Sequence, residues 1–199
     1  MSGAFPISNA KFESLGIKSI QNTIISKSQS GKKLARQIDG QRFGFTARII
    51  TAKRSDVYGE LMGFIIKQRS GKENFTIIPP EVEDARGTAS GTPNGTASAG
   101  ATSITLGGTG TGTLKAGDFI KFANHDKIYM VVADQSDIST GSLTIEPPLT
   151  TAVSSSDIQF DNVPFTVHLT NDIQEFGVVG ADKDGNALYQ FEFDVEESL

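Results

Sequence analysis

Residues 87–113 have the sequence GTASGTPNGTASAGATSITLGGTGTGT, in which 23 of 27 positions are Gly, Thr, Ser or Ala. Alternating, aromatic-rich sequence typical of β-strands lies on both sides of this tract. Such a tract inside a small β protein indicates an insertion, because loops of this length are rare within compact domains. We therefore predict a discontinuous β scaffold, residues 1–86 and 162–199. An inserted β module of residues 87–161, with a flexible Gly/Thr-rich linker, interrupts it.

The bulk composition narrows the class of protein. The chain has 199 residues, of which 37% are hydrophobic, and this is enough for one substantial core or two small ones. It contains no Cys, which excludes disulfides and thiolate metal sites and fits assembly in a reducing cytoplasm. No apolar run approaches the roughly 20 residues needed to span a membrane. The first ten residues lack the features of a secretory signal, so we expect none.

The net charge of −5 is unevenly distributed along the chain. Residues 27–54 hold eight cations against Asp39, whereas residues 172–199 hold eight acids against Lys183. These segments are either two faces that attract each other within one subunit or complementary edges on neighbouring subunits of a homo-oligomer. The second interpretation gives the candidate subunit-interface residues, which are Lys32, Lys33, Arg36, Arg42, Arg48, Glu192, Asp194, Glu196 and Glu197.

Two segments of the scaffold show the period of a half-buried strand. In residues 41–51, aromatic and aliphatic side chains alternate with polar residues and glycine, and residues 188–195 follow the same pattern. An Asp-Gly turn at residues 184–186 precedes the second segment and follows a strand predicted at residues 174–179, which indicates a hairpin. Further scaffold strands are predicted at residues 23–30, 74–78 and 164–169.

One helix is predicted, at residues 56–69, where apolar side chains recur at helical spacing. We expect Ser55 to cap its N-terminus and Gly71 to follow its C-terminus, with Ile66 widening the apolar stripe. In the module, strands are predicted at residues 103–106, 119–122, 128–133 and 142–145. Short strands at this spacing favour a small β-barrel or sandwich.

No motif indicates catalysis, a cofactor or a metal. The glycines of residues 107–112 lack the spacing of a phosphate-binding loop. His125 and His168 are the two histidines, and no convergent metal ligands or nucleophile accompany them, so we expect structural roles. Asp182, Asp184 and Gly185 favour a turn over a calcium loop. We therefore predict that the protein is not an enzyme and that it has no cofactor-binding, catalytic or metal site.

The order of these segments resembles bacteriophage tail virion proteins. The segments that carry this resemblance are an Ala4-Phe5-Pro6 arm, Ser30-Gly31-Lys32-Lys33, Arg42-Phe43-Gly44-Phe45-Thr46, the amphipathic helix, Asn74-Phe75-Thr76-Ile77-Ile78-Pro79-Pro80, Leu114-Lys115-Ala116-Gly117-Asp118-Phe119-Ile120, Lys127-Ile128-Tyr129-Met130-Val131-Val132 and Ile145-Glu146-Pro147-Pro148-Leu149. The resemblance is to distal tail and tail-tube-fold adaptor proteins. It implies a tail-tube-like antiparallel β-sandwich with one α-helix, beside which the inserted module is an addition.

The resemblance also implies a function. The expected role is a structural one in the virion tail: a ring, most simply a homohexamer, around the tail channel that joins the tail tube to the distal tip or baseplate. The expected partners are further copies of the chain and other tail proteins (tube, hub, baseplate or fibre), with DNA passing through the lumen without specific binding and no membrane involved. Residues 1–8 would latch onto a neighbour, and acids such as Glu192 and Asp194 would line the channel. The alternatives are a tail tube (major tail) subunit and a host-glycan-binding tail module.

Overall fold

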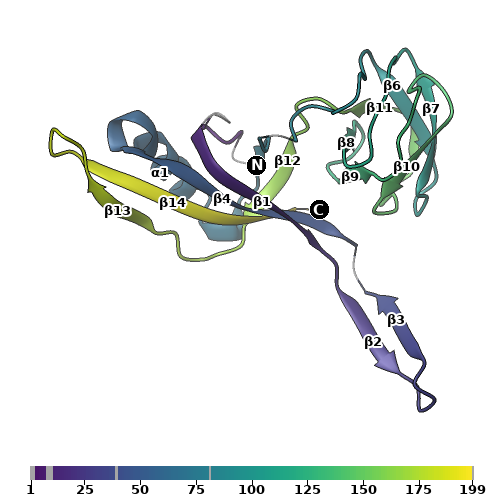
Figure 1. Cartoon of the computed structure of the whole chain (residues 1–199), viewed down its shortest axis with the longest axis horizontal. Coiled ribbons are helices and arrows are strands. Elements are labelled where there is room, and N and C mark those ends of the chain that lie inside the picture. Colours follow the sequence, from purple (N-terminus) through teal and green to yellow (C-terminus); the bar gives the residue numbers. More distant parts are fainter. Residues whose placement is uncertain (1–2, 8–10, 39, 81, 199) are drawn as a thin grey trace.

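The computed structural model describes residues 3–7, 11–38, 40–80 and 82–198 (Figure 1). The described chain is mainly β, with one α-helix, and this confirms the predicted class. The elements are β1 (Phe12–Ile20), β2 (Thr23–Lys27), β3 (Lys33–Gln37), β4 (Arg42–Lys53), the π-helical turn η2 (Arg54–Tyr58), α1 (Gly59–Lys67), the 3₁₀ turn η3 (Ser70–Lys72), β5 (Phe75–Ile77), β6 (Pro93–Ala97), β7 (Ser103–Gly108), β8 (Phe119–Phe122), β9 (Ile128–Val131), β10 (Ser142–Glu146), β11 (Val153–Gln159), β12 (Phe165–Leu169), β13 (Phe176–Ala181) and β14 (Ala187–Glu197).

A six-stranded antiparallel sheet forms the scaffold, in the order β1-β4-β14-β12-β5, with β13 paired to β14. The long strands β4 and β14 lie in its centre and pair with each other. Alternate side chains of β4 from Phe43 to Ile49 are at most 4% exposed, as are Phe191, Phe193 and Val195 of β14. This alternation confirms the pattern that predicted both strands, because burying one face of a sheet requires apolar residues at every second position.

Helix α1 covers the buried face of this sheet, and η2 leads into it without a break. Val57, Leu61 and Ile65 are at most 5% exposed, which agrees with the predicted apolar stripe. Ile66 was predicted to widen that stripe, but it is 72% exposed, because the sheet contacts a narrower arc of the helix. The helical segment begins at Arg54, and neither η2 nor α1 has a side-chain cap, so the prediction that Ser55 caps it is wrong.

The chain leaves the helix through two residues in the left-handed region, Arg69 with a φ of 52° and Ser70 with a φ of 61°. The C-terminal cap is Gln68, so Arg69 is the residue that follows it, and the prediction that Gly71 takes this position is wrong. Gly71 is suited to a close approach, because a Cβ atom there would lie 2.5 Å from the carbonyl oxygen of Leu169 in β12. The turn thus packs against the sheet at a point where a side chain has no room.

The N-terminal arm packs against its own chain. The N–H of Phe5 donates to the carbonyl of Thr76 at 2.7 Å, and the Thr76 N–H donates to Gly3 at 3.1 Å. The Phe5 ring contacts the rings of Phe64, Phe75 and Phe193, all at centroid distances between 5.4 and 6.1 Å. The described part of the predicted latch therefore contacts its own core, because one aromatic side chain fills the gap between helix and sheet. Residues 1, 2 and 8 of that latch lie outside the described residues.

The second unit is a closed barrel of six strands in the order β10-β7-β6-β11-β8-β9 (Figure 1). Its interior is filled by its own cluster of apolar side chains, among them Ile104, Leu114, Phe122, Tyr129 and Leu143, each of which is fully buried. Side chains fill the centre of a barrel of this size, so it has no open lumen. The predicted strands at residues 103–106, 119–122, 128–133 and 142–145 correspond to β7, β8, β9 and β10.

The Gly/Thr-rich tract is not a flexible linker, and this prediction is corrected. It supplies β6 and β7, and its two ends, before β6 and after β7, pair through the Ser90–Thr111 bridge. Side-chain hydroxyls meet across this ribbon in three successive pairs, which are Thr88–Thr113, Ser90–Thr111 and Thr92–Thr109, with O–O distances of 2.7 to 3.3 Å. Small hydroxyl side chains at alternate positions therefore form a cross-strand ladder.

Glycine in this tract has a packing role. A Cβ atom on Gly95 of β6 would lie 2.7 Å from Cγ2 of Ile104 and 2.9 Å from Cε1 of Phe122. Because larger side chains from β7 and β8 fill the barrel at this level, only glycine fits at the inward position of β6.

Candidate functional site: assembly surfaces

Several predicted interface residues lie together on the sheet face opposite the helix, where the chain pairs them with one another. Arg42 donates to Glu196 at 3.1 Å, and Arg48 lies 3.8 Å from Glu192. The pairing of β4 with β14 places Glu192 directly opposite Arg48, so strand register produces this contact. Three cations thus face four carboxylates here, which are Lys18, Arg42 and Arg48 against Glu13, Glu192, Asp194 and Glu196.

Asp194 is held most firmly on this face. Lys18 donates to its carboxylate at 2.8 Å, and the Thr46 hydroxyl is also hydrogen-bonded to it. The Lys18 ammonium, together with Thr46, holds the pKa of Asp194 below its ordinary value of 3.8. The pairs Arg42–Glu196 and Arg48–Glu192, by contrast, join the basic and acidic segments within one subunit, as the first interpretation of the charge pattern expects.

Glu197 has a different role, because it joins the sheet to the barrel. Its side chain is fully buried and forms an ion pair with Lys127, which precedes β9 and is only 2% exposed. The carboxylate also accepts the backbone N–H of Ile128 at 2.7 Å and that of Phe43 at 3.2 Å. The Lys127 ammonium lies 5.1 Å from the centre of the Phe43 ring, and burial lowers its pKa. One carboxylate therefore binds the barrel and the sheet simultaneously.

Apolar packing surrounds this ion pair. Phe119 of β8 lies with its ring centroid 5.2 Å from that of Phe43 and 5.5 Å from that of Phe165. Phe119 and Ile128 of the barrel belong to the buried cluster of the sheet. Sequence reasoning missed Lys127, because a lysine in a predicted turn carries no signal of burial.

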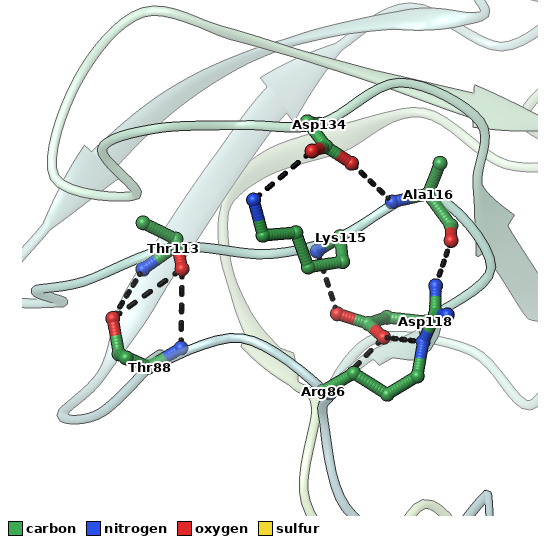
Figure 2. A network of polar contacts seen from close by, with 7 residues as sticks. All are labelled: Arg86, Thr88, Thr113, Lys115, Ala116, Asp118 and Asp134. Atoms are coloured by element: carbon green, nitrogen blue, oxygen red, sulfur yellow. Dashed lines mark hydrogen bonds and ion pairs between the residues drawn. The ribbon is translucent and has the colours of Figure 1, made fainter.

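A second polar network ties the entry segment to the barrel, and Figure 2 shows its five residues beside the Thr88–Thr113 pair. Arg86 donates from its backbone N–H and from Nε to one oxygen of Asp118, at 3.1 and 3.2 Å, and its guanidinium also contacts the carbonyl of Ala116. The other oxygen of Asp118 accepts the N–H of Lys115 at 2.7 Å. Asp134 accepts the Ala116 N–H, which with Lys115 lowers the pKa of its carboxyl. The network fixes the turn of residues 115–118 against the segment that enters the barrel.

The hairpin of β2 and β3 projects from the body of the molecule (Figure 1). It continues the β1–β4 pair outward, and every residue of both strands is exposed. Three predicted interface residues, Lys32, Lys33 and Arg36, lie on this hairpin, and no ion pair engages them within the described chain. The sequence predicted a strand at residues 23–30 but missed β3.

At the other end of the sheet, β13 pairs only with β14 among the described strands, so its outer edge is open (Figure 1). Exposed apolar side chains gather at this edge and in the loop before it, where Ile173 is 85% exposed, Val178 60% and Val179 53%. Asp172 and Glu175 are exposed in the same loop. The surface is therefore both apolar and acidic.

The two histidines lie in structural settings. His125 Nδ1 lies 2.7 Å from the Asn124 side-chain oxygen, and Nε2 lies 2.7 Å from the Tyr129 hydroxyl. Burial lowers the pKa of His125. His168 lies half-buried in β12.

Asp182 accepts the N–H groups of Asp184 and Asn186 in the predicted turn. Hydrogen bonds from Lys53 and Asn186 hold the pKa of its carboxyl far below the ordinary value.

No group of three or more His, Cys, Asp or Glu side chains suited to a metal ion occurs within residues 3–7, 11–38, 40–80 and 82–198. Over the same residues, no helix is both long and apolar enough to cross a membrane.

The mainly β architecture with one helix and a small barrel is the one that a resemblance to phage tail virion proteins predicts. The family comparison is more specific: residues 83–163 match the model of the B domain of distal tail protein pb9. No curated protein matches the chain. The match covers the barrel and the segments that enter and leave it, and for this part it shows a similarity to a domain of a phage distal tail protein.

Proposed function

We propose that the chain forms a homo-oligomeric ring, most simply a hexamer, around the tail channel and joins the tail tube to the distal tip or baseplate. The observation that carries this proposal is the match of residues 83–163 to a distal tail protein domain. The chain divides in this proposal into a ring-forming scaffold, residues 1–86 and 162–199, and a projecting module, residues 87–161. A minimal tail tube subunit would lack such a module, so the tube role is the weaker alternative.

The unsatisfied surfaces of the scaffold support a ring. The two strands with alternating apolar residues, β4 and β14, pair with each other in the centre of the sheet, so neither leaves an open edge there. The outer strands of this sheet are β1, β13 and β5. The N-terminal arm bridges β5 at Thr76, so within the described part of the sheet the edges of β1 and β13 stay open. Closing a ring covers such edges, which otherwise invite uncontrolled association.

The polar sheet face suits a channel through which DNA passes. Its cations are paired with carboxylates, so it offers phosphate groups little uncompensated positive charge. In this proposal, DNA moves through the lumen without specific binding, assembly takes place in the bacterial cytoplasm, and the remaining partners are tube, hub, baseplate or fibre proteins.

Sugar binding and catalysis are not favoured. The aromatic side chains of the module that would stack on sugars are at most 5% exposed, and the chain has no Trp. These side chains are Phe119, Phe122, Tyr129 and Phe160. We propose that the protein has no enzymatic activity; turnover of a host cell-wall or capsular polysaccharide that one carboxylate substitution abolishes would overturn this.

Cryo-electron microscopy of intact particles, together with native mass spectrometry of the purified chain, tests the ring. We expect a closed ring of identical copies at the junction between tube and tip. Density for the chain as a monomeric spike or within the capsid shell would contradict the proposal.

A further inference from the structure

The hairpin of β2 and β3 lacks a covering surface within its own chain. Its two strands pair only with each other among the described strands. Ile24, Ile25, Leu34 and Ile38 are each more than 50% exposed on it. A two-stranded ribbon is marginally stable in water, and exposed branched side chains on it are typical of a surface that binds another molecule.

The two faces of this hairpin differ. Residues opposite each other share a face, and the register pairs Ile24 with Arg36 and Ser26 with Leu34. One face therefore carries Ile24, Leu34 and Arg36, and Ile38 extends it, since its N–H donates to Asn22 at 3.0 Å. Ile25 lies on the opposite face with Lys27 and Lys33. The first face is the more apolar of the two.

The matching surface lies at the far end of the same molecule. There, Ile173, Val178 and Val179 form the exposed apolar edge of β13 and its preceding loop, next to the acidic side chains of Asp172 and Glu175. The hairpin carries Lys27, Lys32, Lys33 and Arg36, and no acid lies within residues 23–38. The two surfaces are therefore complementary both in charge and in apolar character.

We propose that the β2–β3 hairpin of one copy binds the β13 edge and the loop of residues 170–175 of the next copy, with the Ile24–Leu34–Arg36 face toward it. The proposal rests on the ring proposed above and names its contact. Figure 1 shows the hairpin and β13 at opposite ends of the sheet, so one molecule does not bring its own pair together. Such a head-to-tail contact uses two different patches, which is the type that closes into rings.

The hairpin does not have the character of a nucleic-acid or membrane site. Residues 23–38 contain no aromatic side chain to stack on bases or to anchor in a lipid interface. Its apolar side chains occupy both faces between the cations, whereas a surface that follows a phosphate backbone consists mainly of cations.

Because the chain contains no Cys, paired cysteine substitutions test this contact directly. In the full-length protein, we would combine Leu34→Cys with Val178→Cys and oxidise the assembled oligomer. A disulfide requires Cα atoms within about 7 Å, so only a close contact cross-links. We expect a ladder of covalent oligomers on a non-reducing gel. The matched control, Ile25→Cys with Val178→Cys, places the first cysteine on the opposite hairpin face and should yield at least tenfold less product.

Charge reversal gives an independent readout. Arg36→Glu should weaken self-association at least tenfold, and so should Asp172→Lys combined with Glu175→Lys. An equimolar mixture of these two variants should recover larger oligomers in which the two variants alternate, because every contact between unlike variants again joins opposite charges, whereas a contact between identical variants joins like charges. The hairpin contact is overturned if the wild-type chain forms an oligomer, the double-cysteine protein does not cross-link and the charge reversals do not weaken self-association. The ring proposal would still stand after that result. A wild-type chain that stays monomeric in solution and in particles contradicts the ring proposal itself.

The same variant also tests a different ligand for the hairpin. If Arg36→Glu abolishes binding to a DNA duplex or to anionic vesicles and leaves self-association intact, the hairpin binds that ligand and the proposed contact is overturned.

Discussion

Removing the buried ion pair between Lys127 and Glu197 should destabilise the protein strongly and unequally. Lys127→Met leaves the Glu197 carboxylate buried, but the N–H groups of Phe43 and Ile128 still donate to it. Glu197→Ala leaves the Lys127 ammonium buried, and its remaining neighbours among the described residues are the Gln41 side-chain oxygen at 3.4 Å and the Phe43 ring. It also removes the acceptor of two backbone N–H groups. We therefore expect Glu197→Ala to cost more than Lys127→Met.

The magnitude follows from the burial. Breaking one side of a buried pair costs about 3–5 kcal/mol, and each unpaired buried N–H adds roughly 1–3 kcal/mol. Lys127→Met should lie at the lower end, near 3 kcal/mol, and Glu197→Ala at about 5 kcal/mol or above. For a chain of this size, 1 kcal/mol lowers Tm by about 2–4 °C, so we expect losses of roughly 6–20 °C.

Thermal and urea unfolding of the two single variants and the double variant measure these costs. The double variant should be more stable than the sum of the single losses predicts, by at least about 1 kcal/mol, because neither charge is left buried alone. Hydrogen exchange at the amides of Phe43 and Ile128 should accelerate in Glu197→Ala. As a control, Lys115→Met removes an exposed ion pair with Asp134 and should cost about 1 kcal/mol or less. Single losses below about 1 kcal/mol at both buried positions, or strict additivity, would refute the reasoning.

Two further perturbations concern the barrel. Gly95→Ala should destabilise it by about 1–3 kcal/mol, because the added methyl group meets Ile104 and Phe122. Gly16→Ala, in an exposed strand with no atom near the added Cβ, is the control and should be close to neutral; equal Tm values for both variants would contradict the packing argument. Burial lowers the pKa of His125, so the unfolded chain binds a proton at higher pH than the folded chain does, and stability should fall as the pH drops below about 6.5. In urea unfolding at pH 7 and pH 5, His125→Gln should reduce this pH dependence, and an unchanged slope would exclude His125 as its source.

The predictability of each element depends on whether burial shows in its sequence. Strands β4 and β14 bury one whole face, so apolar residues at alternate positions marked them. Strand β6 shows no such alternation, because its inward position is Gly95, where Phe122 and Ile104 already fill the barrel. Strands β2 and β3 are exposed on both faces and carry no burial pattern at all, which explains why β3 was missed.

The candidate interface was predictable in charge but not in pairing. The sequence separates basic from acidic segments. The same residues are compatible with attraction within one subunit and with complementary edges on neighbouring subunits. Only the register of β4 against β14, which places Glu192 opposite Arg48, decides that these side chains meet within one chain. A register is fixed by the whole hydrophobic face of a sheet, so the identity of two charged residues does not reveal it.

The position of the barrel follows from its attachment. Two chain crossings alone would leave a module free to swing, but Phe119 packs between Phe43 and Phe165, and Glu197 binds Lys127 and the Ile128 amide across the junction. A buried charge pair tolerates little displacement, because separating the charges leaves each one desolvated and alone. The barrel is therefore held in a set direction relative to the sheet. If hairpin and β13 edge join neighbouring scaffolds into a ring, every copy presents its barrel at the same angle, and a partner in the tail meets a regular circle of identical modules.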